Sequence, residues 1–225
     1  MKYFSLLLLT LITTITVKAQ ANLFNEQYRF NKFIDKVNSP KGDQLLYADI
    51  EGNAYFAKGF ATANIENATS LVKARYNTYT DTVELLNEDQ IFELPKTAKY
   101  SRIMFQNPSA ILLLMNVENL PQGYYFELVP GKYTLLGKRQ TEFREGAKAV
   151  NSFTPAIAPR FEMVSPVYYI KNGTQIIKVS KKESELINVL PDHKTEAADF
   201  IKKNKIKLNK EEDLLKLVKF LNTTA

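Results

Sequence analysis

Cysteine and tryptophan are absent from the 225 residues, histidine occurs once, and the eight glycines are isolated from one another. Without cysteine the chain has neither a disulfide nor a thiol for a lipid anchor, so its stability must come from a hydrophobic core. With His193 as the one imidazole, a zinc or other transition-metal site is not expected. A glycine-rich phosphate loop is also missing, which argues against a nucleotide. We therefore expect no metal and no cofactor.

Long apolar runs are scarce, and the longest lies at the N-terminus. A lysine precedes the uncharged segment 3–17, and Ala19 supplies the small side chain of a signal-peptidase site. The run is shorter than the about 20 apolar residues that span a bilayer. We expect residues 1–19 to be a signal peptide cleaved before Gln20, and the product to be periplasmic or extracellular and not a lipoprotein. An uncleaved N-terminal anchor is the alternative.

Positive charge is in modest excess, with 30 Lys and Arg against 24 Asp and Glu. Loss of Lys2 and Lys18 with the leader lowers the net charge from +6 to +4. A weakly basic exported protein is more compatible with acidic lipid headgroups or glycans than with nucleic acid. The lysines of Lys202–Lys210 are interpreted as a solvated connection between helices, because acidic residues flank them. Peripheral contact with an anionic membrane surface is the alternative.

Side chains of alternating polarity dominate the middle of the chain. Leu71–Leu94 alternates with period two between turn residues, which is typical of an antiparallel sheet with one buried face. Ile111–Met115 is apolar on both faces and should lie at the centre of the sheet. Short regular spacing favours a meander or barrel over βαβ units. The predicted strands are 44–50, 54–57, 71–78, 82–86, 90–94, 100–105, 110–117, 123–129, 132–138, 161–164, 167–170 and 174–179.

Turn residues separate these segments. Pro130-Gly131 predicts a hairpin, and Asn172-Gly173 predicts a second one whose two-residue loop pairs Tyr169 with Ile176 and Tyr168 with Ile177. Three further segments are a predicted helix over Leu23–Val37, a polar connection over Gly59–Ser70 and a long surface loop over Arg144–Pro159.

Helical spacing replaces period two after Val179, with Pro191 between the first two helices. Asn209 and Glu212 form a capping-box-like start for the last helix. Such short helices are marginal alone and must dock on the sheet. We therefore expect an α+β protein: a predominantly antiparallel curved sheet or partial barrel of about eight to ten strands in residues 20–180, and a small helical module in 181–225.

Several segments carry a resemblance to a known group. They are Tyr76-Asn77, Tyr79, Asp81 and Val83-Glu84-Leu85, then GKYTLLGKR at Gly131–Arg139, PVYYIKNG at Pro166–Gly173 and the tail Phe200–Asn222. Together they resemble a family of small exported proteins of Gram-negative bacteria, which have a β-rich body and a Lys-rich helical tail. The resemblance covers most of the mature chain. It implies export and this fold outline, and it implies no chemistry.

Candidate chemical groups are few. Asp81, Glu84 and Glu93 are the carboxylates to consider for a hydrolase, although Glu84 and Glu93 alternate with apolar neighbours and should face solvent. His193 follows Asp192, with Ser184 nearby, but we interpret Asp192 as a helix cap and His193 as solvated.

Aromatic residues in the strands should fill the core, or line a concave face for an apolar ligand. They are Tyr124, Tyr125, Phe126, Tyr133, Tyr168 and Tyr169. The leading hypothesis is a non-enzymatic binding or envelope-associated interaction protein without catalytic residues. A carrier of a lipid or other apolar ligand is the alternative, and a carboxylate-based hydrolase ranks third.

Overall fold

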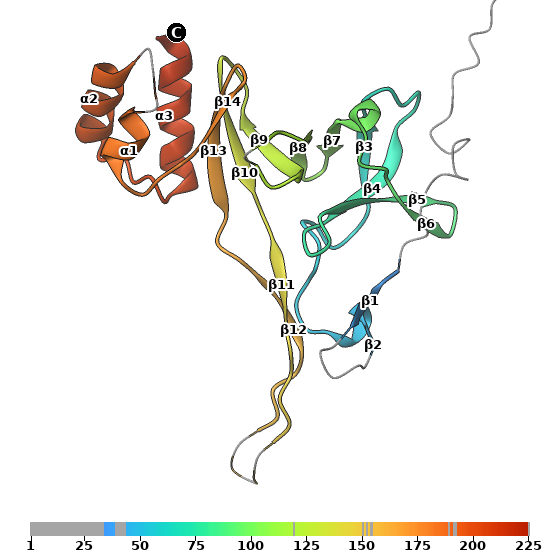
Figure 1. Ribbon diagram of the computed structural model, residues 1–225. Coiled ribbons are helices and arrows are strands. Elements are labelled where there is room, and N and C mark those ends of the chain that lie inside the picture. The colour runs from blue at the N-terminus through green and yellow to red at the C-terminus, as the bar shows by residue number, and fades with distance from the viewer. Residues whose placement is uncertain are drawn as a thin grey trace, which may run out of the picture.

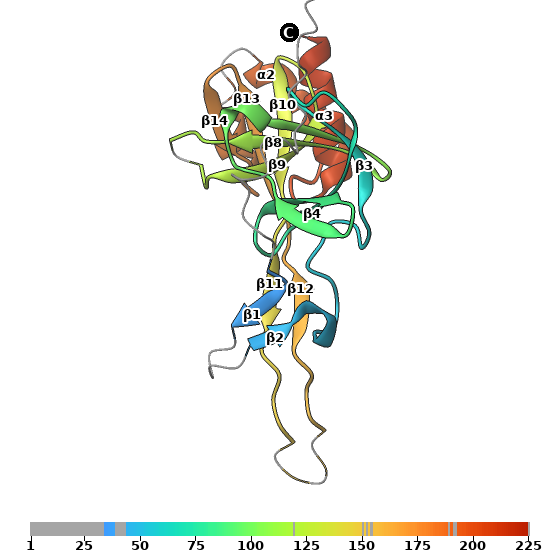
Figure 2. The same cartoon turned by 90° about the vertical axis from the view of Figure 1, so that its right-hand side faces the viewer.

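The computed structural model describes residues 34–38, 44–118, 120–149, 151, 153, 155–188, 190 and 193–224. A curved antiparallel sheet forms the body, three helices cover one part of it, and a long hairpin arm projects away from both (Figures 1 and 2). This is the expected α+β architecture. Within the described ranges, no helix is long and apolar enough to cross a bilayer.

The main sheet has ten strands in the order β14-β13-β10-β9-β8-β7-β3-β4-β5-β6, and all neighbours are antiparallel. It consists of two meanders, β3 to β6 and β7 to β10, joined by pairing of β3 with β7, and a final hairpin on β10. The strands are β3 (Ala61–Ile65), β4 (Val72–Asn77), β5 (Thr82–Asn87), β6 (Gln90–Glu93), β7 (Arg102–Gln106), β8 (Ser109–Met115), β9 (Gly123–Val129), β10 (Tyr133–Lys138), β13 (Val167–Asn172) and β14 (Gln175–Lys178).

The strands predicted between residues 71 and 138 are all present, and β8 lies in the middle of the sheet as expected. The hairpin at Pro130-Gly131 is also confirmed, since β9 pairs with β10. The prediction for Gly59–Ser70 was wrong, because this segment contains β3. Its residues Ala61 and Ala63 have little strand preference on their own, yet Ala63 is completely buried between β4 and β7.

The N-terminal part differs from the prediction. Lys36–Asn38 is strand β1, paired with β2 (Gln44–Leu46), and not the end of a helix; the rest of the predicted helix lies outside the described residues. Beyond β2 the chain turns into the 3-10 helix η2 (Tyr47–Asp49) instead of continuing as a strand. In the predicted strand 54–57, only Tyr55 forms a single bridge, to Asn77.

The arm begins with β11 (Thr141–Arg144) and β12 (Arg160–Met163), which pair with each other. The segment between them is the predicted long loop, and Ala147 and Ile157 bridge its two sides. The next hairpin has a shifted register: Tyr169 pairs with Lys178 and Ile170 with Ile177. The loop is therefore Gly173-Thr174, with Gly173 at φ +58°, and not Asn172-Gly173.

The two largest hydrophobic clusters among the described residues lie in the body, and the partly buried Leu128 packs against both. The first is enclosed by the curvature of the sheet and draws on β3, β4, β5, β7, β8 and β9, with Tyr76, Leu85, Ile103, Leu112 and Tyr124 among its most buried members. The second lies between β10, β13 and the helices. It includes Tyr133, Leu135, Ile170, Leu214 and Leu217, each with no exposed surface, so side chains fill the space beneath the helices.

The three helices are α1 (Glu183–Asn188), α2 (Lys194–Asn204) and α3 (Glu211–Thr223). Near the end of α3, Asn222 clamps the β9–β10 hairpin: it accepts a hydrogen bond from Tyr133 N and donates one to Tyr133 O, both at 2.8 Å. The expected cap at Asn209 is wrong, since Lys210 occupies the N-cap position of α3. Asp213 in the first turn instead accepts a hydrogen bond from Lys207 N.

Candidate functional site

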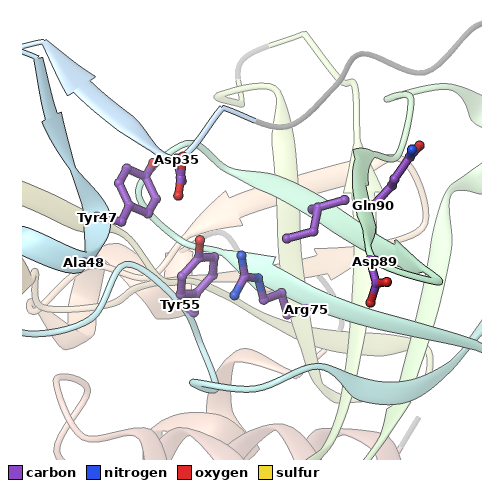
Figure 3. Close-up of a pocket in the computed structure, with 8 residues that line it drawn as sticks. Asp35, Tyr47, Ala48, Tyr55, Arg75, Asp89 and Gln90 are labelled. Atoms are coloured by element: carbon purple, nitrogen blue, oxygen red, sulfur yellow. The ribbon is translucent and has the colours of Figure 1, made fainter.

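A pocket of about 500 Å³ opens where the β1–β2 and η2 segment lies against the β4–β5–β6 part of the sheet (Figure 3). Two phenol rings, one guanidinium group, two carboxylates, one carboxamide and two aliphatic side chains surround it. The lining residues are Asp35, Tyr47, Ala48, Tyr55, Arg75, Asp89, Gln90 and Ile91. We call this the tyrosine pocket. Ligand sites in proteins typically combine such aromatic walls with a few placed polar groups.

The arginine in the wall is held in place from two directions. Arg75 Nε donates to Glu84 Oε2 at 2.7 Å. The Arg75 guanidinium lies 3.9 Å from the centre of the Tyr55 ring, beside which Figure 3 shows it, and 4.4 Å from that of Phe60. The other oxygen of Glu84 accepts a hydrogen bond from Asn77 Nδ2 at 3.0 Å. Stacking together with a charge-assisted hydrogen bond fixes the orientation of this wall.

Asn77 connects the pocket to the turn between β4 and β5. Its Oδ1 accepts hydrogen bonds from the backbone N–H groups of Tyr79 and Thr80, and its Nδ2 lies 3.4 Å from the Tyr47 hydroxyl as well as bonding Glu84. The turn between β4 and β5 thus has a structural role. It supports the rear of the pocket.

The two phenols remain neutral at physiological pH. Burial raises the pKa of Tyr47 to about 12, against the hydrogen bond from Asn77, which lowers it. Burial also raises the pKa of Tyr55, and the negative charge of Glu84 acts in the same direction. Their rings are tilted by 58° with centroids 6.1 Å apart. They therefore offer aromatic surface and neutral hydroxyl groups to a ligand.

Glu84 was expected to face solvent, and this expectation is wrong: the side chain is completely buried. Glu93 is half-buried and lies directly opposite Glu84 on β6. Burial raises the pKa of both carboxyl groups. Since Glu84 has no exposed surface and both of its oxygens are bonded, it positions Arg75 and does not reach a substrate.

Asp81 belongs to a different cluster. Its Oδ1 accepts hydrogen bonds from the Tyr76 hydroxyl at 2.6 Å and from Lys138 Nζ at 2.8 Å, and its Oδ2 pairs with Lys96 at 3.1 Å. Burial lowers the pKa of Lys138, whose side chain is 5 % exposed. Glu84 and Glu93 are therefore cross-strand neighbours, whereas Asp81 lies in a separate cluster. Both oxygens of Glu84 are bonded, to Arg75 and Asn77.

His193 is not solvated as expected. It occupies the N-cap position of α2, its ring lies edge-on to Tyr133, and its Nε2 is buried without a hydrogen-bond partner. The position of Asp192 lies outside the described residues. Of the six aromatic residues, Tyr124, Tyr125, Phe126, Tyr133 and Tyr169 are buried and Tyr168 is half-buried.

The basic run Lys202–Lys210 is the predicted connection between helices, from the last turn of α2 to the start of α3. Its lysines are exposed, while Ile206 and Leu208 anchor it in the core. No group of three or more histidine, cysteine or acidic residues suited to a metal ion occurs among the described residues.

Sequence reasoning missed the tyrosine pocket. Its residues come from five separate segments, and none of Asp35, Tyr47, Tyr55 or Asp89 stands out locally. The one available signal was the neighbouring pair Arg75 and Glu84, whose alternation with apolar residues places both on one face of the sheet. No family model, curated protein or solved structure matches this chain.

Proposed function

We propose that the protein is a non-enzymatic binding protein and that the tyrosine pocket is its ligand site. The observation that carries this proposal is the fixed wall: the Arg75 guanidinium stacks on Tyr55 and is held there by the fully buried Glu84. A wall that is ordered before the ligand arrives lowers the entropy cost of binding. Charged groups in the lining favour a polar ligand over a lipid.

Occlusion of the pocket tests the proposal. Ala48 is exposed and lines the pocket, so Ala48→Trp fills the space without removing a polar contact. Ala149→Trp, on the exposed arm, is the matched control. We expect ligands selected by saturation-transfer NMR from peptides, amines and oligosaccharides to bind the wild type and A149W alike and to lose binding to A48W. Equal binding to A48W would overturn the assignment.

The arm supports a second candidate, interaction with an envelope protein. It extends well beyond the body (Figures 1 and 2), and its Phe153 side chain is 96 % exposed, with Ile157 and Met163 more than half exposed. Exposed apolar side chains on a projecting element are typical of protein interfaces. A photo-crosslinking residue at Phe153 should capture one discrete partner in the native compartment, whereas the same residue at exposed Leu71 should not. Failure at both positions contradicts the idea.

Export remains part of the proposal. The leader predicted over residues 1–19 lies outside the described residues, and N-terminal sequencing of the extracytoplasmic product should begin at Gln20. Peripheral contact of the lysine run with anionic lipid is less favoured, because three acidic residues open α3 directly after it. Cosedimentation with anionic vesicles tests that contact.

A further inference from the structure

We infer that the tyrosine pocket binds an organic cation, an ammonium or guanidinium group on an aliphatic stem. This inference rests on the proposed binding function and specifies its ligand class. The first observation is the balance of charge around the cavity. Asp35 and Asp89 lie at opposite ends of it, and both side chains are exposed (Figure 3).

The positive charge in the wall does not offset these carboxylates. Arg75 is paired with Glu84 at 2.7 Å, so the two form a neutral unit, and the half-buried Glu93 lies next to Glu84 in register. A ligand carboxylate or phosphate would meet a guanidinium that is already paired with a carboxylate, and the other carboxylates around the pocket would repel it. A cation would meet a net negative field.

The aromatic walls favour the same ligand class. Tyr47 and Tyr55 present ring surface to the pocket, and cations are attracted to the faces of such rings. Burial is the main cause of the raised pKa of both phenols; Asp35 and Glu84 act in the same direction, and Arg75 opposes them at Tyr55.

The size and the apolar part of the lining define the stem. A volume of about 500 Å³ is at the lower end for small-molecule sites, and Ala48 and Ile91 supply aliphatic surface beside the polar groups. A lysine or arginine side chain with its flanking peptide bonds has this combination of an apolar stem and a cationic head. A free diamine shares the same chemistry.

Calorimetric titration of the full-length protein tests the ligand class with matched probes. The probes are a capped Gly-Lys-Gly peptide, the same peptide with Nε-acetylated lysine, free 1,5-diaminopentane and a neutral disaccharide. We expect the lysine peptide to bind at least about tenfold more tightly than its acetylated form, which lacks only the charge. Asp35→Asn and Asp89→Asn should each weaken binding roughly threefold to tenfold, and more salt should weaken it further.

Asp199→Asn is the control, since Asp199 is an exposed aspartate on α2 outside the pocket, and it should bind like the wild type. If the lysine peptide binds more tightly than the diamine, the ligand is a peptide. If the diamine binds as tightly as the peptide, the ligand is a small amine. Both results support the inference. Equal affinity for the acetylated peptide, or binding of the disaccharide alone, overturns the ligand class while the binding function stands. Absence of binding by every probe, with A48W indistinguishable from the wild type, overturns both.

Discussion

Arg75 and Glu84 face each other across β4 and β5, with Arg75 Nε 2.7 Å from Glu84 Oε2. The carboxylate is completely buried, whereas the arginine side chain keeps 15 % of its surface exposed and lies against the pocket. Because Glu84 is fixed in the sheet, its ion pair with Arg75 holds the arginine in one orientation beside the ligand site. It also places a titratable group where ionisation is costly.

The first prediction concerns the pH dependence of stability. Because burial raises the pKa of Glu84, the folded protein binds more protons than the unfolded chain above the ordinary value of 4.5 and up to the raised pKa. The free energy of unfolding should fall as pH rises through this window. Glu84→Gln removes this titration. The free energy of unfolding of E84Q should therefore increase relative to that of the wild type as pH rises through the window. Urea unfolding at several pH values measures it, and a constant difference would contradict the assignment.

Removal of the arginine should be more damaging. Arg75→Met leaves the buried carboxylate of Glu84 without its charged partner, which we expect to cost roughly 2–4 kcal/mol at pH 7. The loss should shrink in acid, where Glu84 is protonated. Arg160→Met is the control, because Arg160 is exposed and its carboxylate partner is 3.7 Å away; it should change stability by less than about 0.5 kcal/mol. Equal effects of the two substitutions would show that Arg75 has no special role.

Lys138 should give the opposite pH trend in alkali. Burial lowers the pKa of its amine in the folded protein. Between this lowered pKa and the ordinary value of 10.5, the unfolded chain therefore binds more protons than the folded one. Stability should rise with pH in this window. Lys138→Met should remove that rise, whereas Lys148→Met, at an exposed position on the arm, should keep it. Chemical unfolding between pH 8 and 10.5 makes the comparison, and a wild-type curve parallel to that of K138M would refute it.

Gly123 allows the cluster around Asp81 to close. Its φ is +143°, and a Cβ atom there would overlap the carboxylate of Asp81. Gly123→Ala should therefore destabilise the protein by roughly 2 kcal/mol or more. Gly59→Ala is the matched control, since a Cβ at Gly59 meets nothing within 4 Å. Thermal unfolding of both variants decides the point, and similar melting temperatures would contradict this role for Gly123.

The sheet was largely predictable from the sequence because one buried face imposes period two on each strand. The predictions failed where contacts with distant parts of the chain determine the local structure. The alanines of β3 form a strand because β3 pairs with both β4 and β7. Glu84 alternates with apolar residues as a solvent-facing residue does, yet Tyr47 and Tyr55 lie over that face of the sheet.

The pocket lay beyond local pattern analysis for the same reason. Tyr47 follows β2, Tyr55 follows a turn, and Arg75 lies on β4, so only the folded chain brings them together. The predicted register of the last hairpin was wrong by one residue in the position of its loop. The Asn172-Gly173 pair suggested a loop at those two residues, whereas Asn172 still pairs with Gln175.

The most direct test of the central claim is NMR mapping of backbone amide shifts during titration with the capped lysine peptide. We predict perturbations concentrated at Tyr47, Tyr55, Arg75 and Gln90-Ile91, with little change in the helices. Absence of shifts at these positions, or shifts confined to the arm or the helices, would contradict a ligand site in the tyrosine pocket.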